Sequence, residues 1–452
     1  MTMKTIEQMR QDALRIFEAG VQAVEAGEAV RRHCRLEGNR FTVNGTAVDL
    51  TTIRHIYVVG AGKATAYMAK AIEDILTDRI TAGQITIPYG HRDDLSMIRQ
   101  VEASHPIPDS NGVTGARDMI RLVRQASGPD LVICLISGGG SALTPLPVSG
   151  LTLFDKQETI RTLLSCGASI HEINTIRKHL SGFKGGHLAV ESFPARVMTI
   201  LISDVIGDHP DVIASGPTVP DTSTFAECMK IVSHHRLVDR LPKNVIDHLT
   251  KGAEGKIPET PKPDHPAFVH TTHHIVASNR LAILAAEKQA ADLGYTPVVL
   301  SATIDGETRE IASMHAAIAR EIHQSGHPVP APACMISGGE TTVHITGGGT
   351  GGRNQEFVLA TIPAIARIPD TVVLSGGTDG RDGPTDAAGA VADTGTGARA
   401  DSMGMDPGTF LSDNDAYHFF KALNDLIPAR QTRTNVMDLR IILVSPKKEP
   451  TS

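Results

Sequence analysis

The sequence predicts an α/β fold with two domains, parallel sheets and an active site in the cleft between the domains. Two observations carry this prediction. Segments in which an apolar run is followed by glycines and then by a helical pattern recur along the chain, and strands that alternate with helices form parallel sheets with crossover helices. In addition, 452 residues are too many for a single hydrophobic core.

The expected elements follow one another in a regular order. Residues 6–32 carry apolar side chains at helical spacing with charged residues between them, which predicts an amphipathic helix. The expected strands, most of them followed by a turn and a helix, open the segments 53–76, 130–143, 196–208, 273–294, 297–321, 333–345 and 371–384. Nearly every strand ends in Gly, Ser, Asp or Asn. Because ligands bind at the carboxyl ends of parallel strands, we expect a ligand-binding face in each sheet.

The predicted domain boundary lies at residues 251–268. This segment is rich in proline and glycine and has no hydrophobic period, which is typical of a linker or a long surface loop. It divides the chain into an N-terminal domain of residues 1–250 and a smaller C-terminal domain of residues 269–452.

Composition narrows the possible partners and the compartment. A formal net charge of −7 argues against broad electrostatic binding to nucleic acid or to an anionic membrane. The five cysteines lie far apart and form no CxxC pair, which indicates reduced thiols in a cytoplasmic protein. We expect no signal peptide and, because no run of about 18 apolar residues occurs, no membrane span. The oligomeric state is left open; a homodimer is compatible with the sequence.

The turn after the first long strand resembles a dinucleotide-binding motif but departs from it. Gly60 and Gly62 match the first two glycines of GxGxxG, whereas the third position is Thr65. The strand expected at residues 84–88 is not followed by the acidic residue that binds a ribose hydroxyl. Lys63 sits in the turn, where a helix should begin, and its charge adds to that of the helix dipole unless an anion lies nearby. We expect it to contact phosphate; a solvated surface lysine is the alternative.

A second glycine turn, Ser137–Ser141, follows the apolar run of residues 131–136. Backbone N–H groups in such a turn can hold phosphate. The alternative is a tight strand–helix turn that needs glycine only for its geometry. The sequence contains no GxxxxGK[ST], so this is not a Walker P-loop.

The densest glycine cluster stands before Arg353, in residues 347–352. Residues 341–345 are expected to form a strand, and a helix should begin near Arg353. Loop amides, the helix N-terminus and the guanidinium would then converge on an anion. Glu340, at the preceding strand end, could orient a cation or this arginine.

Carboxylates gather at two further loops. Asp204 stands at a strand end with Asp208 four residues later, where they could hold Mg²⁺ or accept a proton from a hydroxyl, or could form turns and caps. Asp379, Asp382 and Asp386 share one glycine loop and repel one another unless a cation, an arginine or solvent compensates them. The histidines at positions 265, 270, 273 and 274 match no metal-binding spacing, and we expect no metal there.

These motifs together resemble a known family, the class II glycerate 2-kinases. The resemblance runs from near residue 6 to about residue 445 and rests on VVGAGKA, SGGGSAL, INTIRKHLSGFKGG, SDVIGD, SGGETTV, GGRNQEFVLA, GTDGRDGPTDAAGA and TRTNVMDL. Family members have a Rossmann-like N-terminal glycerate-kinase domain and a C-terminal MOFRL domain, and some carry the name hydroxypyruvate reductase of tartrate degradation. Residues 429–431 read Ala-Arg-Gln where a Gly-Pro is expected, which leaves the role of that element open.

The resemblance implies a kinase that uses ATP and Mg²⁺ to convert D-glycerate to 2-phosphoglycerate. The family's proposed catalytic lysine and arginine fall on Lys63 and Arg353, and we add Asp204 as a catalytic carboxylate. Lys63 and Arg353 would both neutralise the transferring phosphoryl group, and domain closure would assemble the active site that contains them. Mg²⁺ is assigned to Asp204, Asp379 and Asp386. The expected nucleotide- or phosphate-binding residues are Gly60, Gly62, Ser137, Gly138, Gly139, Gly140, Ser141, Glu340, Gly348, Gly349 and Asn354.

Two other functions remain open at this point. Hydroxypyruvate reduction needs a nicotinamide site, and the fingerprint for one fails at two positions. A non-catalytic sensor of small acids would bind ligand without turnover. In each case the expected partners are a small molecule and, for the kinase, a nucleotide.

Overall fold

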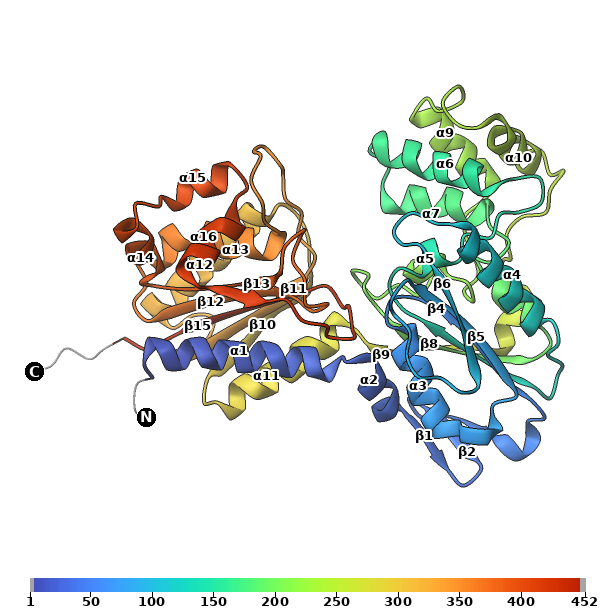
Figure 1. Ribbon diagram of the computed structural model, residues 1–452, viewed down its shortest axis with the longest axis horizontal. Coiled ribbons are helices and arrows are strands. Elements are labelled where there is room, and N and C mark those ends of the chain that lie inside the picture. Colours follow the sequence, from blue (N-terminus) through green and yellow to red (C-terminus); the bar gives the residue numbers. More distant parts are fainter. Residues whose placement is uncertain (1–3, 448–452) are drawn as a thin grey trace, which may run out of the picture. The chain divides into compact units, whose positions relative to one another are not determined.

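The computed structural model describes residues 4–447 and divides into two compact units (Figure 1). The central unit is Ala26–Val276. The split unit combines the N-terminal segment up to Glu25 with the chain from Ala277 onward. The predicted α/β class and two-part organisation are confirmed. No helix among the described residues is long and apolar enough to cross a membrane.

The central unit is built on a six-stranded sheet with the order β6-β5-β4-β7-β8-β9. Its strands are β4 (Ile56–Ala61), β5 (Ala82–Pro88), β6 (Ile98–Ala103), β7 (Leu131–Ile136), β8 (Arg196–Ile202) and β9 (Thr271–Ala277). The pairs from β6 through β8 are all parallel, as the sequence predicts. Every residue of β4 and β7 is buried, because a parallel sheet is covered on both faces. A small antiparallel sheet precedes it, with β1 (Cys34–Glu37), β2 (Arg40–Val43) and β3 (Thr46–Asp49).

Helices cover both faces of this sheet. Tyr57 and Val59 of β4 pack against α4 (Ser110–Val123) and α8 (His187–Ser192) in one core. Successive side chains of a strand point to opposite faces, and the other face carries α3 (Thr65–Leu76). Helix α2 (Ala26–His33) packs against α3 (Figure 1). A separate helical layer has its own apolar core and consists of α6 (Leu153–Ser165), α7 (Ile170–His179), α9 (Phe225–His234) and α10 (Lys243–Ala253). The short helix α5 (Gly140–Leu143) follows β7.

The split unit has a mixed sheet, which corrects the expectation of a parallel one. Its order is β10-β11-β15-β12-β13-β14, and only β10 and β11 pair in parallel. The strands are β10 (Thr296–Ile304), β11 (Ala333–Gly339), β12 (Thr371–Gly377), β13 (Ala387–Asp393), β14 (Leu426–Pro428) and β15 (Asp438–Val444). Strand β15 lies between β11 and β12 and runs antiparallel to both. Apolar runs predict buried strands but not their order or direction, so this insertion could not be foreseen.

Two helical layers sandwich the mixed sheet (Figure 1). One core joins it to α1 (Ile6–Ala23) and α11 (Asn279–Asp292). The other core joins it to α12 (Thr308–Ser325), α13 (Arg353–Ile365), α14 (Thr396–Ser402) and α16 (Ala416–Leu423), with α15 (Pro407–Ser412) beside them. The register places Asp438, the first residue of β15, opposite Gly339 of β11 and Gly377 of β12. A carboxylate therefore stands between two glycine strand ends.

Three predicted elements differ from the structure. The helix expected at residues 6–32 is two helices, α1 and α2, which belong to different units. Residues 341–345 form no strand. The boundary expected at 251–268 falls inside the central unit, because the chain continues from there into β9 of the parallel sheet. Amphipathicity predicted that α1 is buried on one side, but it does not say which sheet lies under that side.

Candidate functional site

In the central unit, the turn after β4 is closed by its own hydrogen bonds. The N–H of Gly62 donates to Thr86 O at 3.2 Å and that of Lys63 to Gly138 O at 2.9 Å. The N–H of Ala64 donates to Ser137 Oγ at 3.0 Å, and that of Thr65 to Gly62 O at 3.4 Å. The four successive amides from Gly62 to Thr65, on which a dinucleotide pyrophosphate would rest, thus donate to protein atoms.

The first two glycines of this turn serve packing. A Cβ on Gly60 would lie 2.1 Å from Leu135 O, and one on Gly62 would lie 2.1 Å from Ser137 Oγ. Gly62 also has a φ of 149°, which favours glycine. The predicted phosphate role of Gly60 and Gly62 thus has a structural alternative, the close approach of the β4 and β7 connections. Ser137 belongs to the same contact, because its Oγ also lies 3.1 Å from Thr65 Oγ1.

The turn after β7 is open where the first is closed. Among residues 4–447, no acceptor is hydrogen-bonded to the N–H groups of Gly138 and Gly139. Gly139 adopts a left-handed conformation with a φ of 84°. Two successive free amides in such a turn form an anion-binding concavity. We call Gly138 and Gly139 the glycine cradle.

Three charged or polar side chains surround the glycine cradle. A Cβ on Gly138 would lie 2.0 Å from Asp204 Oδ2, so this carboxylate packs directly against that glycine. A Cβ on Gly139 would lie 3.0 Å from His105 Cδ2 and 3.3 Å from Lys63 Cγ. Lys63 and Asp204, both predicted from the sequence, therefore meet at the predicted glycine turn. His105 was missed; its only signal is its place after β6.

His105 is held in its neutral form. Burial, reinforced by the charges of Lys63 and His91, lowers the pKa of His105 to about 4. At neutral pH its imidazole can therefore accept or donate one hydrogen bond beside the cradle without adding charge. The lysine is left as the cation of this group.

Ser141, at the far end of the turn, leads into a hydrogen-bond chain. Its Oγ lies 2.6 Å from Ser215 Oγ. Ser215 donates to Asn174 Oδ1 at 3.0 Å, and Arg177 Nη1 donates to the same oxygen at 2.8 Å. The chain connects the glycine turn with helix α7.

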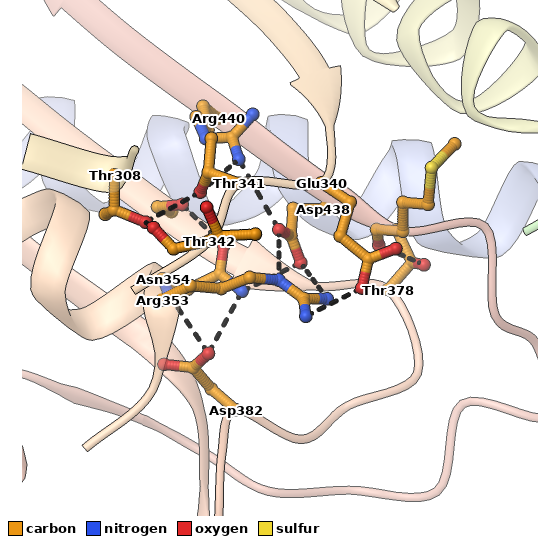
Figure 2. A network of polar contacts seen from close by, with 12 residues as sticks. Thr308, Glu340, Thr341, Thr342, Arg353, Asn354, Thr378, Asp382, Asp438 and Arg440 are labelled. Carbon is orange, nitrogen blue, oxygen red and sulfur yellow. Dashed lines mark hydrogen bonds and ion pairs between the residues drawn. The ribbon is translucent and has the colours of Figure 1, made fainter. Parts of the chain in front are cut away.

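In the split unit, the site is organised by Asp438, which sequence reasoning did not single out. Its side chain is 0% exposed and accepts from Arg353 Nε at 2.6 Å and Nη2 at 3.0 Å. Glu340 Oε1 lies 2.8 Å from Arg353 Nη1, as expected from its place at the strand end (Figure 2). Arg440 Nη2 adds a longer contact to Asp438 at 3.4 Å. Arg353 is thus paired with two carboxylates rather than left open.

The N-terminus of α13 is capped by Asp382. This buried carboxylate accepts from the N–H groups of Asn354 at 3.0 Å and Gln355 at 2.8 Å. Burial raises the pKa of Asp382 to about 6, against the effect of these hydrogen bonds. Asn354, predicted to bind a cofactor, donates instead to Asp438 at 2.9 Å and accepts from Ser375 at 2.6 Å. The expected anion at this helix terminus is therefore a side chain of the protein.

The glycine loop before Arg353 is also used internally. Gly348 N donates to Asp413 Oδ1 and Gly349 N to Asp413 O, both at 2.9 Å, and Gly347 N donates to Asn414 Oδ1 at 3.0 Å. A Cβ on Gly347 would lie 2.3 Å from Asp413 O. The glycines allow the loop to approach the segment between α15 and α16. The predicted phosphate cradle at Gly348 and Gly349 is occupied by these contacts.

A cavity of about 550 Å³ nevertheless opens beside this network. Its walls include Glu340, Arg353, Asp382 and the glycine loop. Arg353 is 34% exposed there. A guanidinium has five N–H donors, and three of those in Arg353 are used by Asp438 and Glu340. The others can meet a ligand in the cavity.

The carboxylates predicted to bind metal in this unit have separate protein partners. Asp379 Oδ1 accepts from Arg381 N at 3.1 Å, and Asp386 Oδ1 accepts from the Tyr417 hydroxyl at 2.7 Å. Within residues 4–447, no three His, Cys, Asp or Glu side chains are grouped so that they could hold a metal ion. The geometry therefore gives Asp379 and Asp386 no shared metal site.

Comparison with known proteins supplies the family. Residues 12–250 match the model of a domain of unknown function, DUF4147, and residues 333–438 match the MOFRL family. A glycerate 2-kinase of Pyrococcus horikoshii is 36% identical over 98% of this chain and 99% of its own. The chain belongs to the glycerate 2-kinase family.

Two further proteins similar to this chain bear on its fold and on the activity names within the family. A crystal structure of glycerate kinase from Thermotoga maritima is 35% identical and superimposes with a TM-score of 0.86, covering 97% of this chain and all of that one. A protein of Agrobacterium vitis, provisionally named a hydroxypyruvate reductase, is 44% identical over 86% of this chain and 98% of its own. The family therefore carries two different activity names.

Proposed function

We propose that the protein is a glycerate 2-kinase, which transfers the γ-phosphoryl group of ATP to the 2-hydroxyl of D-glycerate and releases 2-phosphoglycerate and ADP. The names of its relatives from Pyrococcus horikoshii and Thermotoga maritima support this reaction. The observation that carries the proposal is the glycine cradle, whose two amides donate to no protein acceptor among the described residues and have Lys63 and Asp204 beside them.

Each residue around the cradle has a role that follows from its charge. The amides of Gly138 and Gly139 bind phosphoryl oxygens, and Lys63 neutralises the charge that spreads over these oxygens in the transition state. Asp204 holds Mg²⁺, because Mg²⁺ is commonly bound by one or two carboxylates together with substrate phosphates. A single carboxylate beside phosphate-binding amides fits that pattern. A Mg²⁺ ion held there would offset the negative charge of the nucleotide phosphates.

In the split unit, we assign Arg353 to ligand binding in the 550 Å³ cavity. Its pairing with Asp438 fixes the plane of the guanidinium, and its remaining N–H donors face an anionic group of a ligand. Glu340 completes the fixed geometry from the other side. We also propose a cytoplasmic location, which is supported by five cysteines that form no disulfide.

Hydroxypyruvate reduction is the second candidate, and the name of the Agrobacterium vitis relative favours it. The closed turn after β4 argues against it, because its amides donate to protein atoms rather than toward a dinucleotide. A sensor without turnover would keep an anion site but would need no carboxylate beside it.

One comparison separates these functions. The purified protein is given D-glycerate with ATP and Mg²⁺, and in parallel hydroxypyruvate with NADH or NADPH. We expect ADP and 2-phosphoglycerate in the first reaction and no nicotinamide oxidation in the second. Oxidation of NADH or NADPH at ordinary enzymatic rates, without ATP turnover, would overturn the proposal, as would binding of glycerate without any product.

A further inference from the structure

Three basic side chains lie together in the central unit without a carboxylate. Lys156 is on α6, Arg177 on α7, and Lys184 in the loop between α7 and α8. Lys156 is 5% exposed and Lys184 only 1%. No Asp or Glu among residues 4–447 forms an ion pair with any of the three. We call them the basic cluster.

The neighbouring Lys178 shows what is missing. It is also buried, but its Nζ lies 3.5 Å from Asp221 and 3.6 Å from Asp211. The basic cluster instead meets neutral oxygens. Lys184 Nζ donates to the carbonyl and hydroxyl of Thr144, and Lys156 Nζ reaches the carbonyl of Leu146 at 3.4 Å.

Burying such charges is expensive when no opposite charge accompanies them. Burial lowers the pKa of Lys156 to about 7, that of Arg177 to about 10, and that of Lys184 well below its usual value. The charge of Arg177 also lowers the pKa of both lysines, and the charge of Lys156 lowers that of Lys184 further. An anion placed among them would remove both penalties.

Donors remain available for such an anion. Within residues 4–447, one of the five N–H groups of Arg177 has a partner, Asn174 Oδ1. Asn174 accepts from both Ser215 and Arg177, while its Nδ2 donates to no acceptor in the part of the chain that the structure describes. A planar guanidinium with free edges matches a carboxylate or a phosphate in two-point contact.

The basic cluster is joined to the glycine cradle in two ways. The connection that begins at Gly138 continues through α5 to Thr144 and Leu146, the residues whose carbonyls accept from the two lysines. A second link is the hydrogen-bond chain from Ser141 through Ser215 and Asn174 to Arg177. A ligand held at the cradle could therefore extend a second anionic group toward the cluster.

We propose that the basic cluster of Lys156, Arg177 and Lys184 binds the carboxylate of the acceptor substrate. The inference rests on the proposed function. Glycerate has one anionic group, on the carbon next to the 2-hydroxyl, whereas the phosphoryl group has its own partners at the glycine cradle. The cluster would thus select small 2-hydroxy acids against neutral polyols, because an alcohol without a carboxylate offers these basic groups no anion.

The test compares Lys156→Met and Lys184→Met with the control Lys178→Met. Methionine keeps much of the length of lysine and removes the charge. Binding of D-glycerate, glycerol and inorganic phosphate is measured by calorimetry on the full protein, together with thermal melts without ligand. For the two cluster variants we expect glycerate affinity to fall about tenfold to a hundredfold, while the ligand-free Tm is unchanged or rises, because a repelling buried cation has gone. Lys178→Met should lower the Tm, since it removes the lysine charge that lies 3.5 Å from the buried carboxylate of Asp221.

Steady-state kinetics of the Arg177→Lys variant test carboxylate binding a second time, with a substitution that keeps the positive charge. The KM for D-glycerate should rise while the KM for ATP stays within about twofold, because only the planar fork is lost. Unchanged glycerate binding in both methionine variants would overturn the inference. A loss of phosphate or ATP affinity in place of glycerate affinity would also overturn it and assign the cluster to a phosphoryl group.

These results are separable from failure of the proposed function. If the wild-type protein binds D-glycerate through the cluster but transfers no phosphoryl group, the reaction is wrong and the carboxylate site stands. If it phosphorylates D-glycerate and all three variants keep the wild-type KM for glycerate, the carboxylate site is wrong and the reaction stands.

Discussion

Replacing Asp438 with asparagine should lower both the stability of the split unit and the catalytic efficiency that depends on Arg353 in its cavity. Asp438 accepts from Arg353 Nε and Nη2, from Asn354 Nδ2 and, at longer range, from Arg440 Nη2. The substitution keeps the shape of the side chain but removes its charge. It also replaces one acceptor oxygen by an NH₂ group, which faces donors.

The magnitude follows from what is left behind. Removing one partner of a buried ion pair costs about 3–5 kcal/mol. The lower end applies here, because Arg353 is 34% exposed and keeps its contact with Glu340, whereas Arg440 is 1% exposed and loses its carboxylate. We expect a loss of about 3 kcal/mol. For a unit of this size, this corresponds to a fall in Tm of roughly 6–12 °C.

The chain offers a matched control in Asp393. This buried carboxylate accepts from Arg10 Nη1 at 2.5 Å and lies 3.6 Å from Arg399, at the end of β13, whereas Asp438 begins β15. Because β13 and β15 are both antiparallel to β12, these two carboxylates lie near opposite ends of β12: Asp393 opposite Val372 and Asp438 opposite Gly377.

The assay is differential scanning fluorimetry followed by glycerate kinase kinetics on both asparagine variants. Asp393→Asn should lower Tm and leave kcat/KM within about threefold of wild type. Asp438→Asn should lower Tm and also reduce kcat/KM by at least tenfold, because the guanidinium of Arg353 is no longer fixed. If the two variants have the same kinetics, or if Asp438→Asn melts like wild type, the account of this network is refuted.

Three further outcomes are expected. Gly138→Ala should reduce kcat/KM for ATP by more than tenfold with a modest change in Tm, because the added Cβ would lie 2.0 Å from Asp204 Oδ2; wild-type kinetics would remove Gly138 from the site. Asp204→Asn should raise the Mg²⁺ concentration for half-maximal activity, whereas Asp386→Asn, whose carboxylate accepts from a tyrosine, should not; the opposite order would move the metal. Between pH 7 and about 10, the unfolded chain binds a proton that buried Lys156 (pKa about 7) does not. The unfolding free energy of wild type relative to Lys156→Met should therefore rise with pH by up to about 1.4 kcal/mol per unit, and denaturant titrations at pH 7.5 and 9 that show no difference would contradict this.

Local patterns predicted the strands well because buried strands are apolar along their whole length. The runs ending at Ala61, Ile136 and Gly339 became β4, β7 and β11, and the helix expected near Arg353 begins at that residue. Strand order escaped prediction, because it depends on which apolar faces meet in space. The insertion of β15 between β11 and β12 is the clearest case.

The grouping of several candidate residues in the central unit was predicted from local patterns. Lys63, Gly138, Gly139 and Asp204 were identified from glycine turns and strand ends, and the structure brings them together. Glycine density misled the prediction at residues 347–349, where the close neighbour is the backbone of Asp413 rather than an anion. A sequence shows that a backbone must approach something closely, but not what it approaches.

Residues that act through distant contacts gave little signal. Asp438 is the first residue of an ordinary apolar strand, and His105 stands alone after β6. Lys156, Arg177 and Lys184 belong to three different segments. Nothing in their spacing shows that they lie together, because their proximity arises only when α6, α7 and the following loop pack on the connection after β7.

The central claim is that the glycine cradle and Lys63 carry phosphoryl transfer. It is tested most directly by the kcat of Lys63→Ala for phosphorylation of D-glycerate, with Lys70→Ala as control. Lys70 is on α3, half-exposed and paired with Asp74 at 2.7 Å. We predict that Lys63→Ala, folded by its thermal melt, loses at least about a hundredfold in kcat, while Lys70→Ala stays within about threefold of wild type. A folded Lys63→Ala variant with kcat within about threefold of wild type would contradict the account.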